Sequence, residues 1–139
     1  METRFARKLN DLLAALVNLR ASLSLDPAAF PALVADNIKS GQIQKFEFTI
    51  ELLWKTQQAF LLETDGIDAV APKAVAKAFV EAGHGDYATY ELLIQALNDR
   101  NHLSHIYRQE MAEAILQRLP EYLRMTEALA AVMQAASSN

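Results

Sequence analysis

The sequence predicts an all-α fold, an up-and-down four-helix bundle with one additional short helix, and three observations lead to it. Apolar residues recur at steps of three and four along the four longest segments, as on the core-facing stripe of an amphipathic helix. No segment shows the apolar and polar alternation of a half-buried strand. With only four glycines and four prolines in 139 residues, and no internal repeat, the chain fits neither a disordered nor a fibrous protein.

The first helix is expected to run from the N-terminal end to about residue 24. Its core-facing stripe consists of Phe5, Leu9, Leu12, Leu16, Leu19 and Leu23. Asp26 followed by Pro27 is typical of an N-cap with proline at the first helical position, and Pro31 repeats a start signal. We therefore expect a short helical connector that leads into the next element and kinks at Gly41.

The second long helix is expected to begin at Ile43. Its stripe consists of Ile43, Phe46, Ile50, Leu53, Trp54, Gln57, Phe60 and Leu61. Glycine is favoured just beyond a helix C-terminus because it adopts the left-handed conformation without strain. The Asp65–Gly66 pair should therefore end this helix.

A short third helix, Lys73 to Ala82, is expected next, opened by Ala71–Pro72 and closed by the pair Gly83 and Gly85. Asp86 is then the predicted N-cap of a helix that begins at Tyr87. The core side of this fourth helix reads Tyr90, Leu93, Ile94 and Leu97.

The last helix is expected beyond residue 108, and Pro120 should kink it rather than end it. Its stripe consists of Met111, Ile115, Leu119, Tyr122, Leu123, Leu129 and Val132. The length fits a single helical domain over residues 1–139, with residues 1–3 and 136–139 frayed.

Composition excludes several classes of protein. The chain has no cysteine, which rules out disulfides, thiolate catalysis and thiolate zinc sites. Its net charge of −4 removes the global basic field that many nucleic-acid binders use, so any RNA site must be local. No stretch is long and apolar enough for a bilayer span. We expect a cytoplasmic protein without a membrane partner.

The densest polar segment is DRNHLSHIYR, residues 99–108, which holds two of the three histidines. Continued as a helix, it carries two adjacent polar stripes: Asn101, His105 and Arg108, and Arg100, Ser104 and Tyr107. Arg100 and His105 lie about 140° apart on an ideal helix. They do not point together within one chain unless the helix bends or ends between them, and a second subunit could close that gap.

Arginine and histidine together suit phosphodiester chemistry. A guanidinium can hold a phosphate bidentately, and an imidazole can take a proton from a ribose 2′-hydroxyl or give one to the leaving oxygen. No metal is needed for that scheme. His102 and His105 could share a metal, but no carboxylate completes a ligand set, so no metal or other cofactor is expected. A capped, solvated helix end explains the same residues on composition alone.

Several segments together resemble the HEPN superfamily and, within it, the nucleotidyltransferase substrate-binding-protein group. These are Lys45-Phe46-Glu47, Glu51 through Lys55, and Ala71-Pro72 at the start of a short helix, followed by Arg100, four residues, His105, one residue and Tyr107. The likeness covers nearly the whole chain. It implies a helical bundle that dimerises about a two-fold axis and unites two copies of the arginine and histidine motif in one cleft.

The resemblance also implies an activity and a partner. Members are commonly metal-independent ribonucleases, and many in this group are toxins neutralised by a minimal nucleotidyltransferase antitoxin. Arg100 would bind the scissile phosphate of the RNA, His105 would be the acid–base, and Asn101 would support one of them. The hydroxyl of Tyr107 would be the group that the antitoxin can modify with adenylate in toxin members, and the added negative charge would repel RNA phosphate from the cleft. The alternative for Tyr107 is a packed hydroxyl donor.

Ser104 and Glu51 are further candidates for a supporting role. The simplest interpretation of Glu47, Glu51 and Lys55 is a surface ladder of side chains one helical turn apart. Two other functions remain open: a non-catalytic subunit that presents substrate to a nucleotidyltransferase, and a plain helical interaction module.

Overall fold

The computed structural model describes residues 1–105 and 109–137, with the side chains of Ser104 and His105 also outside the description. All regular structure in this part is helical. The elements are α1 (Arg4–Leu23), the 3-10 turn η1 (Pro27–Ala29), α2 (Ala32–Asp65), α3 (Pro72–Glu81), α4 (Tyr87–His105) and α5 (Gln109–Ser137). Four long helices and one short helix confirm the predicted all-α class.

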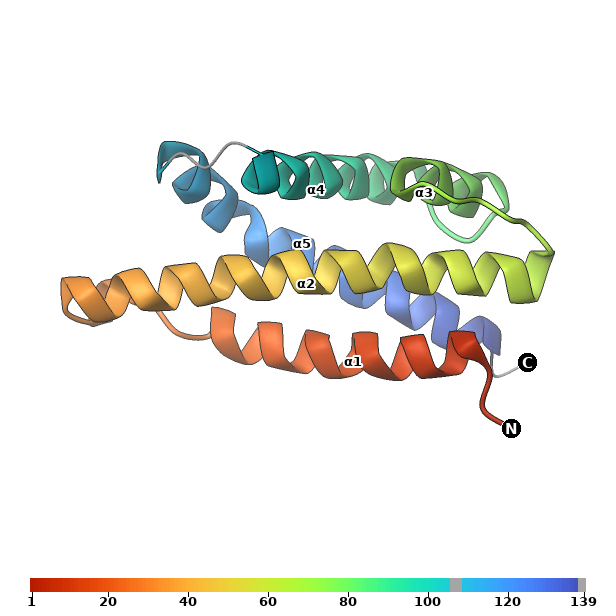
Figure 1. The fold of residues 1–139 in the computed structure, drawn as a ribbon, viewed down its shortest axis with the longest axis horizontal. Coiled ribbons are helices and arrows are strands. Elements are labelled where there is room, and N and C mark those ends of the chain that lie inside the picture. Colours follow the sequence, from red (N-terminus) through yellow and green to blue (C-terminus); the bar gives the residue numbers. More distant parts are fainter. Residues whose placement is uncertain (106–108, 138–139) are drawn as a thin grey trace.

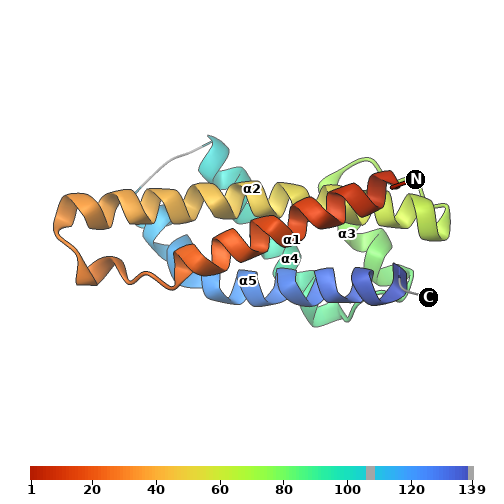
Figure 2. The same ribbon diagram turned by 90° about the horizontal axis from the view of Figure 1, so that it is seen from below.

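The four long helices alternate in direction, as an up-and-down bundle requires (Figure 1). Helix α2 contacts every other helix of the described chain, while α1 lies against α2 and α5 (Figure 2). The short α3 sits beside the C-terminal part of α2 and contacts α4. The N-terminal end of α1 and the C-terminal end of α5 lie at the same end of the bundle (Figure 1).

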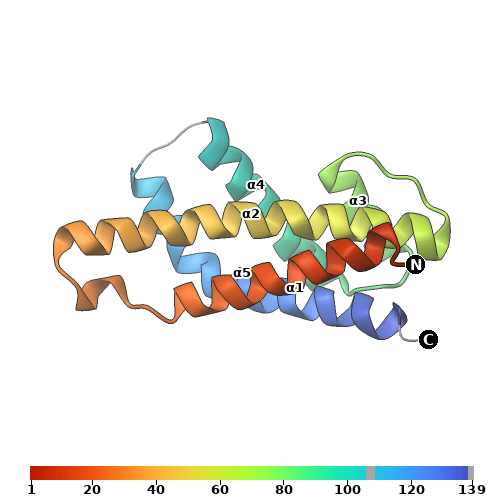
Figure 3. The same cartoon turned by 60° about the horizontal axis from the view of Figure 1, so that its bottom comes forward.

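Helix α2 begins at Ala32, eleven residues before the expected start at Ile43. Periodicity missed these turns because they carry no core-facing stripe: Leu33 and Val34 are exposed, and the helix projects past the end of α1 (Figures 2 and 3). The expected connector is only the three-residue η1. Helix α2 is unbroken and nearly straight in Figure 1, so the kink expected at Gly41 is not observed.

Most of the predicted helix boundaries are confirmed within a residue or two. Helix α3 begins at Pro72, and α4 begins at Tyr87, where the N–H of Thr89 donates to Oδ1 of Asp86 at 2.7 Å. That backbone hydrogen bond holds the pKa of Asp86 below its usual value. Thr3 caps α1, because its side chain accepts a hydrogen bond from the N–H of Ala6. At the other end of the chain, α5 includes residues 136 and 137, which we expected to fray.

The core runs through the whole bundle and is centred on α2. Phe60 lies between Phe5 and Phe79, with ring centroids 5.2 and 5.8 Å away, and Phe46 stacks on Tyr122 at 5.4 Å. Helix α5 continues through Pro120 and changes direction in its first half (Figure 3), which confirms a bend rather than an end. The predicted stripe is wrong at its last position, because Met133 is buried and Val132 is exposed.

Gly66 ends α2 as predicted. Its φ of 67° lies in the left-handed region, its N–H donates to the carbonyl of Leu62, and the N–H of Ile67 donates to that of Leu61. These two bonds satisfy carbonyls at the helix end that have no partner within the helix. The local backbone, rather than crowding, demands glycine here, because a Cβ would meet no atom within 4 Å.

Alanine substitutions at Gly41, inside α2, and at Gly66, at its C-terminal end, should change stability in opposite directions. Gly66→Ala is expected to lower the free energy of unfolding by about 1 kcal/mol, because alanine is strained at positive φ. Gly41→Ala is expected to raise it by up to about 1 kcal/mol, because Gly41 lies inside α2 with open space around it. Urea unfolding of both variants measures the two effects, and equal signs would contradict this account.

Candidate functional site

Arg100 faces α2 from the C-terminal half of α4. Its Nη2 lies 2.8 Å from Oε2 of Glu51, and about a quarter of each side chain is exposed. The predicted phosphate-binding arginine is thus held against a carboxylate, in a position that solvent still reaches. Glu51, which the sequence left as a candidate for a supporting role, is the residue that α2 contributes to this contact.

Glu51 is held by two donors from its own helix as well. Nε1 of Trp54 donates to Oε2 at 3.0 Å, and Nζ of Lys55 lies 3.2 Å from Oε1. Burial alone would raise the pKa of Glu51, but the bonds from Trp54 and Lys55 and the charge of Arg100 together hold it below its usual value. Glu51 is therefore a carboxylate anion at neutral pH.

A second carboxylate lies one helical turn before Glu51. Glu47 is half-buried, and this burial raises its pKa, while the positive charge of Arg100 acts in the opposite direction. The ladder inferred from the sequence therefore exists, with a pair between Glu51 and Lys55 four residues apart, but it faces Arg100 rather than only solvent. Two acidic side chains of α2 thus act on one guanidinium of α4.

The structure describes only some of the other predicted site residues. Asn101 and its neighbour His102 are exposed on α4. The side chains of Ser104 and His105, and the whole of Tyr107, lie outside the described residues. The structure therefore brings together Arg100 and Glu51, while the roles of Asn101, Ser104, His105 and Tyr107 stay predictions.

Asp99, the residue before Arg100, is the centre of a hydrogen-bond network that spacing along the chain did not predict. Asp99 is buried and accepts two hydrogen bonds from Arg118, each of 2.9 Å, and a third from the hydroxyl of Tyr122. Burial and the bond to Asp99 raise the pKa of Tyr122, so its hydroxyl remains a donor. Asp99 thus ties α4 to α5 beside the candidate site.

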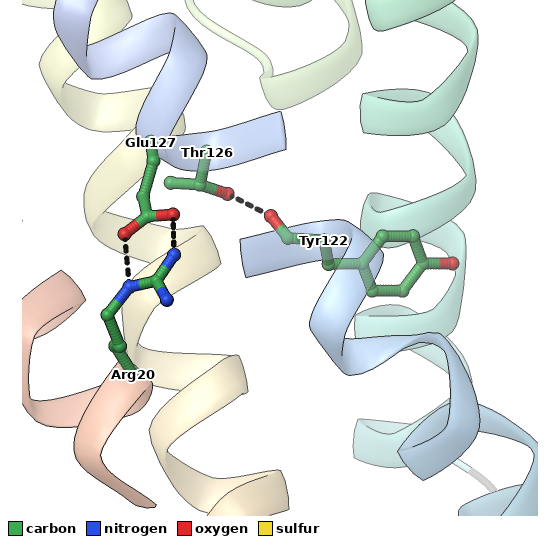
Figure 4. A network of polar contacts seen from close by, with 4 residues as sticks. All are labelled: Arg20, Tyr122, Thr126 and Glu127. Carbon is green, nitrogen blue, oxygen red and sulfur yellow. Dashed lines mark hydrogen bonds and ion pairs between the residues drawn. The ribbon is translucent and has the colours of Figure 1, made fainter. Parts of the chain in front are cut away.

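In Figure 4, neighbouring residues of α5 face two different helices, α4 and α1. The ring of Tyr122 points toward α4, away from Arg20 and Glu127, and the hydroxyl of Thr126 donates to the carbonyl of Tyr122 at 2.8 Å. On the other side Nε of Arg20 donates to Glu127 at 2.8 Å and joins α1 to α5. The sequence carried no signal for the contact of Tyr122 with Asp99 or of Arg20 with Glu127, because no spacing rule links residues on separate helices.

Within residues 1–105 and 109–137, no three histidine, aspartate or glutamate side chains lie close enough to hold a metal ion. In the same ranges, no helix combines the length and the apolar character needed to cross a membrane.

Comparison with known proteins identifies the family. The sequence model described as "Nucleotidyltransferase substrate binding protein like" matches residues 7–135. The chain belongs to the nucleotidyltransferase substrate-binding-protein-like family. The resemblance drawn from the α2 segments and the Arg100 to Tyr107 motif is thereby confirmed at the level of the group.

The chain is also similar to a named protein and to two solved structures. A Haemophilus influenzae protein named probable ribonuclease HepT is 33% identical over 98 residues, which cover 67% of this chain and 65% of that relative. A Thermus thermophilus structure superposes with a TM-score of 0.77 at 31% identity, over 88% of this chain and 98% of that one. A Haemophilus influenzae structure, presented as the fold of a substrate-binding domain of a nucleotidyltransferase, gives 0.77 at 29%, over 91% and 98%.

Proposed function

We propose that this chain is a HEPN-type ribonuclease toxin that cleaves RNA in the cytoplasm without a metal. The observation that carries the proposal is the ion pair of Arg100 with Glu51: a guanidinium on a partly exposed helix face already holds an anionic oxygen. A phosphate offers oxygens of the same charge and similar geometry. The relative named probable ribonuclease supports RNA as the class of substrate.

The proposed reaction needs only side chains that the chain supplies. The ribose 2′-oxygen attacks the adjacent phosphorus while the imidazole of His105 accepts its proton. The bond from phosphorus to the 5′-oxygen breaks, and an imidazolium donates a proton to that oxygen. The products are a 2′,3′-cyclic phosphate and a 5′-hydroxyl. Arg100 stabilises the charge that grows on the phosphate oxygens, and Asn101 and Ser104 support this arrangement.

The proposal includes a homodimer and an antitoxin. Because Arg100 and His105 are five residues apart on α4, a two-fold partner is the simplest way to bring an arginine and a histidine onto one phosphate. The antitoxin is a minimal nucleotidyltransferase, which inactivates the toxin by adenylylating Tyr107. The added phosphate would repel RNA from the cleft.

Expression in a bacterial host tests this function. The wild type is expected to arrest growth and to degrade RNA, while His105→Ala does neither, because the acid–base group is gone. His102→Ala is the matched control, since His102 is an exposed histidine of the same helix and should leave toxicity unchanged. A folded wild type that neither arrests growth nor cleaves purified RNA would refute the proposal.

The alternative is a non-catalytic subunit that presents substrate to a nucleotidyltransferase. The family description and the description of the Haemophilus influenzae structure favour it. It differs from the ribonuclease in one outcome: His105→Ala would leave the activity of the complex with the nucleotidyltransferase unchanged.

A further inference from the structure

We propose that Glu51 is a built-in competitor of the RNA phosphate for Arg100. Its carboxylate occupies the guanidinium in the free protein, and RNA binds by taking its place. This inference rests on the proposed function, because it assumes that Arg100 receives a phosphate of RNA. It adds a regulatory element to that site: the affinity for RNA is set by how readily Glu51 gives up Arg100.

The geometry of the contact supports exchange rather than permanent support. Arg100 Nη2 and Glu51 Oε2 are 2.8 Å apart, the distance of a charge-assisted hydrogen bond, and both side chains are reached by solvent. Carboxylate and phosphate oxygens are interchangeable acceptors for a guanidinium. An incoming phosphate can therefore form the same kind of bond that Glu51 forms.

Glu51 can release Arg100 without being left as an unpaired charge. Nε1 of Trp54 and Nζ of Lys55 both belong to α2, three and four residues further on, and they contact Glu51 at 3.0 and 3.2 Å. Lys55 also lies 6.0 Å from the centre of the Trp54 ring. These partners move with Glu51, so its charge remains compensated when Arg100 turns to RNA.

The second carboxylate, Glu47, makes the site select RNA over small anions. It lies one turn from Glu51, and the charge of Arg100 acts on it. A small anion such as inorganic phosphate must displace Glu51 with a single contact to Arg100. It then lies near the carboxylate of Glu47, which repels it. A polynucleotide brings further phosphates and so can outweigh this repulsion. We therefore expect the site to bind RNA and to reject free phosphate.

Trp54 provides a direct report of the exchange. It is the single tryptophan of the chain, and its indole N–H donates to the same Oε2 that contacts Arg100. Loss of the Arg100 contact changes the charge beside the indole. Tryptophan emission should therefore change on RNA binding, independently of any cleavage.

The experiment measures binding of a 2′-O-methyl RNA oligonucleotide, which cannot form the 2′,3′-cyclic phosphate, to the full chain. Affinity comes from anisotropy of the labelled oligonucleotide and from Trp54 emission. Glu51→Gln is expected to tighten binding about three- to fivefold, the size of a partly exposed ion pair. Glu63→Gln is the matched control, because it removes an exposed charge from the same helix and should change affinity less than twofold. In an Arg100→Ala background, Glu51→Gln should have no effect beyond that of the control.

The outcomes test the competition by Glu51 separately from the proposed ribonuclease activity. Weaker or unchanged binding by Glu51→Gln would mean that Glu51 positions Arg100 rather than competes for it, and would overturn the inference. Absence of binding by all variants would also overturn it. Binding in the expected order without cleavage of ordinary RNA would leave the inference standing and refute only the ribonuclease.

Discussion

Arg100→Ala is expected to slow RNA cleavage by about 100- to 1,000-fold, the usual loss when one stabilising donor is removed from a transition state. The loss should fall mainly on kcat, because the charge that Arg100 stabilises grows as the phosphorus–oxygen bonds rearrange. The measurement is single-turnover cleavage of a short RNA with purified protein. Retention of cleavage within threefold of wild type would exclude Arg100 from the reaction.

Two comparisons separate this effect from a loss of structure. Arg100→Lys keeps the charge but loses the planar pair of donors, so it should retain more activity than alanine and less than wild type. Thermal unfolding should change little in either variant, because the Arg100–Glu51 contact is partly exposed and Glu51 keeps Trp54 and Lys55. A large drop in stability would show that the lost activity reflects unfolding.

The features that the sequence predicted correctly are those with local signals. Asp65–Gly66, Pro72 and Asp86 end, begin and cap helices through bonds within a few residues, so spacing alone located them. The apolar stripe of Phe46, Ile50 and Leu53 placed α2 against the core. The first turns of α2 have no such stripe, because there the helix extends beyond its neighbours, and its true start was missed.

The candidate site was only partly predictable, since its contacts join distant parts of the chain. The motif identified Arg100, but the partner that α2 provides could not be chosen between Glu47 and Glu51 without the relative rotation of α2 and α4. The same limit hid Asp99: its neighbours along α4 say nothing of Arg118, nineteen residues on, or of Tyr122. Tyr122 matched the core stripe, so packing alone was inferred for it.

Asp99→Ala is expected to lower the free energy of unfolding by about 2–4 kcal/mol, a large share of the stability of a small protein. The substitution leaves the buried hydroxyl of Tyr122 without its acceptor and removes the carboxylate that pairs with Arg118. The cost falls below that of a fully buried ion pair, because a third of the Arg118 side chain is exposed. Urea unfolding followed by circular dichroism measures it.

Two variants divide this cost in the free energy of unfolding into its parts, and a third serves as the control. Tyr122→Phe removes only the hydroxyl and should cost about 1 kcal/mol, the net value of one hydrogen bond. Asp99→Asn keeps the side-chain shape but not the charge, so it should fall between Tyr122→Phe and Asp99→Ala. Asp11→Ala, an exposed aspartate on α1, should change stability by less than about 0.5 kcal/mol. If Asp99→Ala matched Asp11→Ala, the Asp99 network would not hold α4 to α5, and the orientation of Arg100 would have to depend on its contact with Glu51 instead.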